Sequence, residues 1–156
     1  SLDGTKLSAY DLITLYHEWI KKYHMISIED GLAEDDWDNW QVLTKELGDK
    51  IMLIGDDLFC TNEERLKKGI KNKVANAVLI KLNQVGTVSE TIKTVKLAQK
   101  NNYSLMVSHR SGETTDDFIA DLAVAVGAEF IKSGSLSRGE RLAKYNRLLE
   151  IEENLL

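Results

Sequence analysis

The unit that decides the fold is spelled out by residues 77–100, which read AVLIKLNQVGTVSETIKTVKLAQK. It opens with four apolar residues, Ala77 to Ile80, a length and composition typical of a strand buried on both faces. Lys81 follows at once, and the amphipathic segment from Val88 to Asn101 has the spacing of a helix. Residues 77–100 therefore predict a strand, a polar tip and a helix, in that order.

The same order recurs along the chain. Amphipathic segments of helix length lie at Leu7–Tyr23, Asp36–Leu47, Asn62–Lys73, Val88–Asn101, Asp116–Val126 and Arg138–Glu153. Short apolar runs that end on chemically active side chains predict strands. They lie at Met25–Ile28 before Glu29, Ile51–Ile54 before Asp56, Ala77–Ile80 before Lys81, Leu105–Val107 before His109, and Phe130–Ile131 before Lys132. The polar tips recur roughly every 25 residues, which predicts an array of about five βα units.

An alternating βα pattern implies a parallel sheet in an α/β fold. A closed βα barrel of about 250 residues allots about 31 residues to each of its eight units, so this chain holds about five of them. An open doubly wound sheet is the alternative, and a glycine-rich phosphate loop after a strand would favour it. The sequence has neither GxGxxG nor a Walker motif. Because barrel enzymes build their sites at the carboxyl ends of strands, the polar tips favour part of a barrel.

Length and composition exclude several classes of protein. At 156 residues, 43% of them hydrophobic, we expect one globular domain. A net charge of -5 argues against a basic field that binds nucleic acid or anionic membranes. The longest apolar stretch, Leu122–Ala128, is too short to insert into a membrane, and a single cysteine suits a reducing cytosol. We therefore expect a soluble, cytoplasmic protein.

Helix starts are marked by Ser or Thr followed three residues later by Glu or Asp. Such a pair lets side chains bond amide groups that the helix leaves free. The expected pairs are Thr61 with Glu64, Thr87 with Glu90, Thr114 with Asp117, and Ser137 with Glu140.

Carboxylates end the first two predicted strands. Glu29 and Asp56 would occupy adjacent positions at the carboxyl edge of a parallel sheet, where their oxygens suit a hard divalent cation such as Mg²⁺. Capping of the following helices, or pairing with surface bases, is the alternative. The other acidic residues nearby are expected to be solvated or to cap helices: Asp30, Glu34, Asp35, Asp36 and Asp57.

Two lysines follow predicted strands. Lys81 places an ammonium at the end of a strongly apolar run, where burial favours base or Schiff-base chemistry. A structural lysine that extends its ammonium to solvent is the alternative. Lys132 follows the shorter run Phe130–Ile131, and both a functional and a structural role stay open for it.

The stretch Ser108–Thr114 joins an imidazole, a guanidinium, hydroxyl groups and a glycine. These come from His109, Arg110, Ser111 and Gly112, and they suit a phosphate or carboxylate that approaches backbone amides. A purely structural histidine is the alternative for His109. The residues alone thus predict a divalent metal, a lysine base or Schiff base, and an anion pocket on part of a βα barrel.

The chain resembles the enolase family. Val78–Thr87, VLIKLNQVGT, is similar to the family's signature segment, and four other motifs fall in the family's order. They are Ser27–Asp30, Gly55–Leu58, Ser108–Thr114 and Glu140–Asn146. The resemblance covers essentially the whole chain, and Gly31-Leu32 and Ser133–Ser137 resemble bacterial members of the family. It implies that the chain is the carboxyl-terminal part, about five βα units, of an enolase-type TIM barrel. The expected domain is therefore a carboxyl-terminal portion, residues 1–156, without the amino-terminal domain and the first barrel strands.

Enolases are lyases of glycolysis that interconvert 2-phosphoglycerate and phosphoenolpyruvate by removing a proton next to a carboxylate and expelling hydroxide. Carried over by motif, the resemblance implies that Glu29 and Asp56 bind Mg²⁺ and contact the substrate. It implies that Lys81 is the catalytic base.

The remaining motif residues are implied to bind substrate. Arg110 and Ser111 would hold the phosphate, Lys132 would bind the carboxylate, and His109 would line the pocket. Two positions depart from the family pattern: Phe130 stands where glutamine is common, and Ser133 where threonine is common.

The family's third metal-binding aspartate, its glutamate general acid and the loop for a second Mg²⁺ would all lie upstream of Ser1. We therefore expect the isolated chain to be inactive, and the full-length protein to be a cytoplasmic homo-oligomer with a cell-surface or secreted fraction. Two alternatives remain. One is a barrel aldolase that forms a Schiff base at Lys81, and the other is a non-catalytic fragment that binds surface proteins or an RNA-processing complex, as some enolases do.

Overall fold

The computed structural model describes residues 6–155 and contains one five-stranded parallel sheet with the strands in sequence order. The strands are β1 (Ser27–Glu29), β2 (Met52–Gly55), β3 (Ala77–Ile80), β4 (Ser104–Ser108) and β5 (Phe130–Lys132). The helices are α1 (Ala9–Lys22), α2 (Trp37–Leu47), α3 (Glu63–Asn72), α4 (Leu82–Val85), α5 (Val88–Lys100), α6 (Phe118–Ala125) and α7 (Gly139–Leu155). The five predicted βα units are confirmed.

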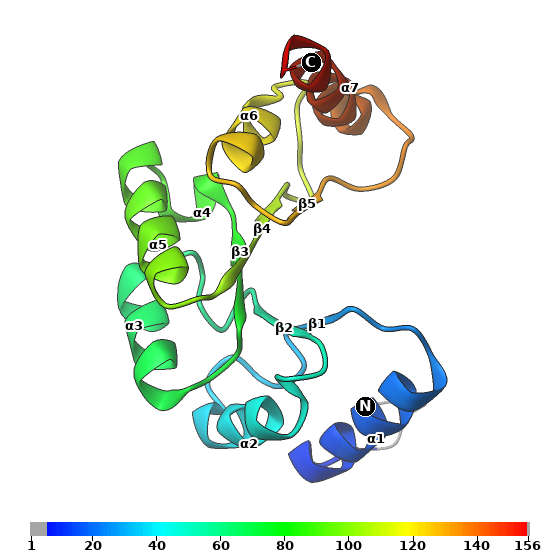
Figure 1. Ribbon diagram of the computed structural model, residues 1–156, viewed down its shortest axis with the longest axis vertical. Coiled ribbons are helices and arrows are strands. Elements are labelled where there is room, and N and C mark those ends of the chain that lie inside the picture. The colour runs from blue at the N-terminus through cyan, green and yellow to red at the C-terminus, as the bar shows by residue number, and fades with distance from the viewer. Residues whose placement is uncertain (1–5, 156) are drawn as a thin grey trace.

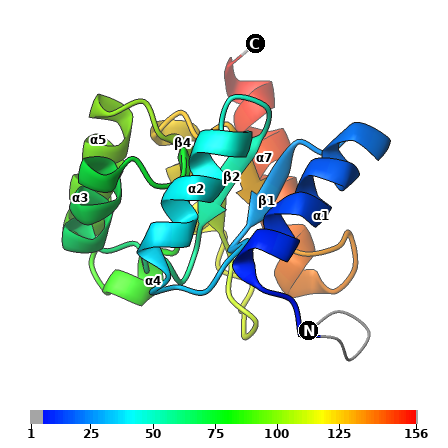
Figure 2. The same cartoon turned by 90° about the horizontal axis from the view of Figure 1, so that it is seen from below.

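The sheet is curled, and helices follow its convex side (Figure 1). A doubly wound sheet would carry helices on both faces, whereas here α2, α3, α5 and α6 lie along one face and leave the opposite face open (Figures 1 and 2). At least one helix joins each pair of consecutive strands, and consecutive strands are neighbours in the sheet. The expectation of an α/β fold that forms part of a barrel is therefore confirmed.

The main core lies between the sheet and the helices. Trp40, Leu53, Leu66 and Val78 are fully buried there. Their burial is the dominant stabilising term, since each large apolar side chain removed from water contributes about 1.5–3 kcal/mol. A smaller apolar cluster on the other face of the sheet consists of Ile54, Ala77 and Leu79 with Met52 and Met106 beside them.

Helix starts agree only in part with the predicted caps. Thr87 accepts the Glu90 amide hydrogen and caps α5, as predicted. At α3 the prediction is wrong, because Asn62 is the cap and Thr61 turns inward. It is also wrong at α6, where Thr114 accepts the amide hydrogen of Asp116 and the capping position belongs to Asp117. Within residues 6–155, Ser137 makes no side-chain hydrogen bond to the first turn of α7.

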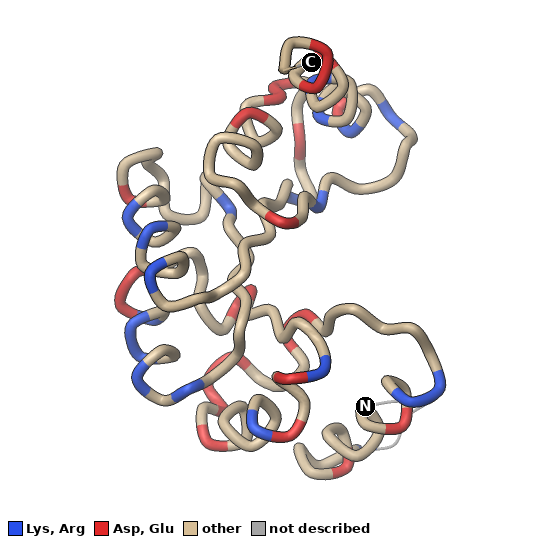
Figure 3. The backbone as a smooth tube through the Cα atoms, viewed as in Figure 1, with Lys and Arg blue, Asp and Glu red and all other residues tan. Residues whose placement is uncertain are grey.

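Charged residues of both signs occur along the outer helices (Figure 3). This mixed distribution agrees with the small negative net charge of the chain. In the described part of the chain, every helix is too short or too polar to cross a membrane.

Candidate functional site

Strand register directs the predicted site residues to the open face of the sheet. Glu29 of β1 pairs with Ile54 of β2, so the two side chains point to the same face. Alternate residues of a strand share a face, and Asp56 lies two residues beyond Ile54. Glu29 and Asp56 therefore both face the concave side, about one pleat apart along the strand direction.

The same argument applies to the next three strands. Leu79 of β3 pairs with Met106 of β4, which puts Lys81 and Ser108, two residues further on, at the same level. Ser108 in turn pairs with Lys132 of β5. The carboxyl ends of five neighbouring strands thus place two carboxylates, two ammonium groups and a hydroxyl on one face.

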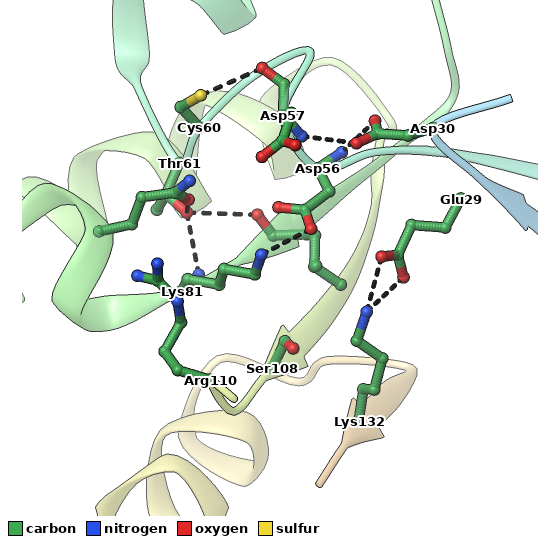
Figure 4. A network of polar contacts seen from close by, with 12 residues as sticks. Glu29, Asp30, Asp56, Asp57, Cys60, Thr61, Lys81, Ser108, Arg110 and Lys132 are labelled. Atoms are coloured by element: carbon green, nitrogen blue, oxygen red, sulfur yellow. Dashed lines mark hydrogen bonds and ion pairs between the residues drawn. The ribbon is translucent and has the colours of Figure 1, made fainter. Parts of the chain in front are cut away.

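Two ion pairs occupy this face (Figure 4). The Lys81 Nζ lies 2.6 Å from Oδ2 of Asp56, with both side chains mostly buried. The Lys132 Nζ lies 2.6 Å from each carboxylate oxygen of Glu29, and this pair is about one third exposed. Both lysines predicted to be functional therefore contact a carboxylate predicted to bind metal.

Asp56 retains a free, inward-facing oxygen. Its Oδ1 is buried and has no hydrogen-bond partner in the described structure, although Oδ2 accepts a hydrogen bond from Lys81. A buried carboxylate oxygen without a partner costs about 1–3 kcal/mol, so a cation that approached this atom would relieve the penalty. One oxygen each from Asp30, Asp56 and Asp57 lie within 4.8 Å of one another.

Asp30 plays a different part from the one expected of it. Its two carboxylate oxygens accept the amide hydrogens of Asp56 and Asp57 at 2.9 and 2.8 Å, and its backbone adopts a positive φ of 43°. The prediction that Asp30 is solvated or caps a helix is wrong. Burial raises the pKa of its carboxyl, while the two amide hydrogen bonds act in the opposite direction. Asp30 therefore ties the end of β1 to the loop after β2.

The loop after β4 is held by helix α7. Arg141 donates through Nη1 to the carbonyl of Arg110 at 2.9 Å and through Nη2 to the carbonyl of Ser111 at 2.8 Å, and it also contacts Nδ1 of His109. Burial, together with the Arg141 charge, lowers the pKa of His109. The Arg110 guanidinium bonds Oδ1 of Asn83, which follows β3.

A buried lysine strengthens the same loop. Lys144 of α7 is 1% exposed and donates to Glu113 Oε2, to the Thr114 carbonyl and to the Glu140 carbonyl at 2.7–2.8 Å. Glu113 uses its other oxygen to accept the amide hydrogen of Arg110. Burial opposes ionisation of Glu113, but these hydrogen bonds outweigh it and lower its pKa.

A cavity of about 470 Å³ opens beside this loop, lined by Asn83, Ser108, Arg110, Glu113 and Lys144 among others. With a guanidinium at its wall, it suits an anionic group. Ser111 contributes its carbonyl to Arg141, whereas its hydroxyl makes no hydrogen bond in the described structure. The structure thus brings Glu29, Asp56, Lys81 and Lys132 together in two pairs and places His109 and Arg110 on the adjoining loop.

Sequence reasoning missed the residues that hold the site in place. Thr61, Asp30, Glu113 and Lys144 bond to the backbone or side chains of the predicted site residues or of their loop. Sequence periodicity could not predict the contacts of Thr61, Asp30 and Lys144, because each joins residues 20 or more positions apart. The contact of Glu113 with the Arg110 amide is local, but no helix or strand spacing predicts it. For Lys144 a signal did exist, since it belongs to the motif Glu140–Asn146 that resembles the family.

Comparison with known proteins places the chain in a family. Residues 1–156 match the family model described as the enolase, C-terminal TIM barrel domain. The chain is 58% identical to the enolase of a Nitratiruptor species over 154 residues, and 60% identical to that of Elusimicrobium minutum over 155. Each match covers 99% of this chain and 37% of the relative. The chain therefore belongs to the family of enolase carboxyl-terminal TIM barrel domains, and it spans little more than a third of the length of these relatives.

Proposed function

We propose that the full-length protein carrying this chain is an enolase, which interconverts 2-phospho-D-glycerate and phosphoenolpyruvate, and that this chain is its carboxyl-terminal domain. The observation that carries the proposal is the contact between the Lys81 ammonium and the Asp56 carboxylate at the ends of adjacent strands, in a chain of this family. Barrel enzymes assemble their catalytic groups at this edge. The remaining parts of the site would come from the amino-terminal portion.

Glu29 and Asp56 would hold Mg²⁺. Both are carboxylates on the concave face, and the buried Oδ1 of Asp56 has no partner in the described structure, as a metal ligand requires. Magnesium bound there would offset the negative charge that develops on the substrate carboxylate when the proton leaves. Glu29 and Asp56 would thereby lie close to the substrate as well.

Lys81 would act as the base. In its neutral form the amine takes the proton from carbon 2 of 2-phosphoglycerate and becomes an ammonium, and the electron pair of the broken C–H bond moves into the carboxylate. Asp56, 2.6 Å away, would stabilise the ammonium that forms. The electron pair then returns from the carboxylate to form the double bond between carbons 2 and 3, and hydroxide leaves carbon 3. A general acid, which we propose lies in the portion of the full-length protein upstream of Ser1, would protonate this hydroxide to water.

The anion-binding groups would orient the substrate. Arg110 and Ser111 would bind the phosphate, His109 would line the pocket, and Lys132 would bind the carboxylate. A guanidinium suits phosphate because it presents several N–H donors in one plane. The contacts of Arg141 with the carbonyls of Arg110 and Ser111 keep this loop in one conformation before substrate arrives.

Replacement of Lys81 by Ala in the full-length protein tests the proposal. Exchange of the carbon-2 proton with solvent deuterium should fall by at least about a thousandfold, while substrate binding changes little, because a base acts mainly in the transition state. Lys96→Ala removes an exposed lysine of α5 and serves as the control. Exchange at the normal rate in Lys81→Ala would rule Lys81 out as the base.

Borohydride trapping separates the aldolase alternative. A Schiff base between Lys81 and a carbonyl substrate would be reduced to a stable adduct and detected by mass, whereas the proposed reaction forms no covalent bond to lysine. A trapped adduct at Lys81 would favour the aldolase.

Because the relatives carry the name enolase, we also propose that the full-length protein is a cytoplasmic homo-oligomer that acts on small-molecule substrates.

A further inference from the structure

Thr61 lies in the loop between β2 and α3 and has an unusual conformation. It is fully buried, and its φ of 53° follows a φ of 51° at Cys60. Two successive non-glycine residues in the left-handed region are uncommon, and a β-branched residue there is a clear outlier. Such a conformation persists only where surrounding contacts hold it.

The Thr61 side chain contacts the backbone of Lys81 and of its neighbours. The Thr61 Oγ1 accepts the amide hydrogen of Lys81 at 2.9 Å. It also lies 3.3 Å from the carbonyl oxygen of Leu79 and 3.2 Å from Oε1 of Gln84, and its single proton is donated to one of these two acceptors at a time. One hydroxyl therefore joins the loop to the end of β3 and to α4.

The backbone of Thr61 is anchored from the other side. Its carbonyl accepts a hydrogen bond from the hydroxyl of Thr94, a buried residue of α5, at 3.0 Å. Because Asn62 supplies the cap of α3, the Thr61 hydroxyl is free for the contact with Lys81. Asn62 therefore caps α3 while Thr61 bonds Lys81, which explains why the capping pattern in the sequence predicted the wrong residue.

The same loop contacts Lys81 at both of its ends. At the beginning of the loop, the Asp56 carboxylate bonds the ammonium at 2.6 Å, and at its end Thr61 bonds the backbone amide (Figure 4). The loop is closed by the Asp56 carbonyl, which accepts the amide hydrogens of Phe59 at 3.1 Å and Cys60 at 2.7 Å. The backbone and the charged tip of Lys81 are thus fixed relative to one short segment.

We propose that Thr61 is a positioning residue for the lysine base. Its hydroxyl fixes the backbone of Lys81 where β3 ends, so that the amine stays within reach of the proton it removes. This inference rests on the proposed function, because it assigns Thr61 a role in the proton transfer at Lys81. Misplacement of a reacting group by about 1 Å can reduce a rate by about a hundredfold, so the contact affects the rate far more than it affects substrate binding.

The test compares Thr61→Val with Thr61→Ser in the full-length protein. Valine keeps the shape and removes the acceptor, whereas serine keeps the hydroxyl. We expect Thr61→Val to reduce both kcat and exchange of the substrate's carbon-2 proton by at least about tenfold, with KM within about twofold of the unmodified protein. Thr61→Ser should restore most of the lost rate.

A matched control separates positioning from general loss of stability. Thr91 of α5 is also a fully buried threonine. Among the described residues its hydroxyl donates only to the carbonyl of Thr87, the residue that caps α5. Thr91→Val should leave exchange within about twofold even if the melting temperature falls. Thr61→Ala provides a smaller replacement if Thr61→Val does not fold, and it should show the same loss of exchange.

The outcomes distinguish the two proposals. Loss of exchange in Lys81→Ala, together with normal exchange in folded Thr61→Val, would overturn the positioning role and leave the proposed base intact. Equal losses in Thr61→Val and Thr61→Ser would also overturn it, because the hydroxyl would then be irrelevant. Normal exchange in Lys81→Ala would instead refute the proposed function.

Discussion

The Lys132 ammonium contacts both carboxylate oxygens of Glu29, although these residues lie on the first and last strands of the sheet and 103 positions apart in sequence. In a flat five-stranded sheet the edge strands would be about 19 Å apart, at about 4.8 Å per strand. Curling of the sheet brings these two side chains together across the concave face. The pair therefore belongs to the site that the curvature creates.

Lys132→Met in the full-length protein should raise KM for 2-phosphoglycerate at least about tenfold, because a cation proposed to bind the substrate carboxylate is lost. Steady-state kinetics would show this, with Lys96→Met, an exposed lysine, as the control. A KM unchanged within about twofold would assign Lys132 to the ion pair with Glu29 alone.

The proposed metal ligands can be distinguished from the neighbouring group of aspartates. Glu29→Gln and Asp56→Asn should each weaken Mg²⁺ binding by at least about tenfold, because each removes a charged oxygen ligand. Asp57→Asn, on an exposed residue of the aspartate group, should change it by less than about twofold. Calorimetric titration with Mg²⁺ measures all three. Weak binding in Asp57→Asn with normal binding in Glu29→Gln would place the cation among Asp30, Asp56 and Asp57 instead.

Lys144→Met should destabilise the protein by about 3 kcal/mol, since it leaves the Glu113 carboxylate without its cation in a buried site. Urea denaturation of the full-length protein measures the loss, and Lys100→Met on the exposed surface of α5 is the control. Adding Glu113→Gln to Lys144→Met should recover part of the loss. A double variant less stable than Lys144→Met would contradict the ion pair as the cause.

Stability should depend on pH through His109. Burial and the Arg141 charge lower the pKa of this imidazole below its ordinary value of 6.5. The unfolded chain then takes up a proton at higher pH than the folded chain, so the free energy of unfolding falls as the pH drops below about 6.5. His109→Gln should reduce this decline in melting temperature between about pH 7.5 and 5.5, while His24→Gln, at an exposed position, should preserve it. An identical decline in both variants would assign the effect to other groups.

The isolated 156-residue chain should self-associate and show no detectable enolase activity. Among the described residues, β1 and β5 each present an unpaired sheet edge, and such edges template association with other chains. The activity should be absent because the general acid and one metal ligand are expected upstream. Sedimentation together with an assay of phosphoenolpyruvate formation tests both points. A compact, active monomer would contradict the proposed placement of these groups.

The sequence by itself determined the βα repeat. Apolar runs such as Ala77–Ile80 and amphipathic segments such as Val88–Asn101 depend on local spacing, and their strands and helices lie within a few residues of the predicted bounds. The polar tips Glu29, Asp56, Lys81 and Lys132 could be identified for the same reason, because each lies within two residues of the end of an apolar run.

Only the tertiary structure decided which of these tips meet and what holds them. The pairs Asp56 with Lys81 and Glu29 with Lys132 depend on register and on the curl of the sheet, which no local pattern encodes. Thr61 shows the limit most clearly. The sequence around Thr61 fits a helix cap as well as it fits any other role. The contact between Thr61 and Lys81 forms because the loop after β2 meets the end of β3, although the two residues lie 20 positions apart in sequence.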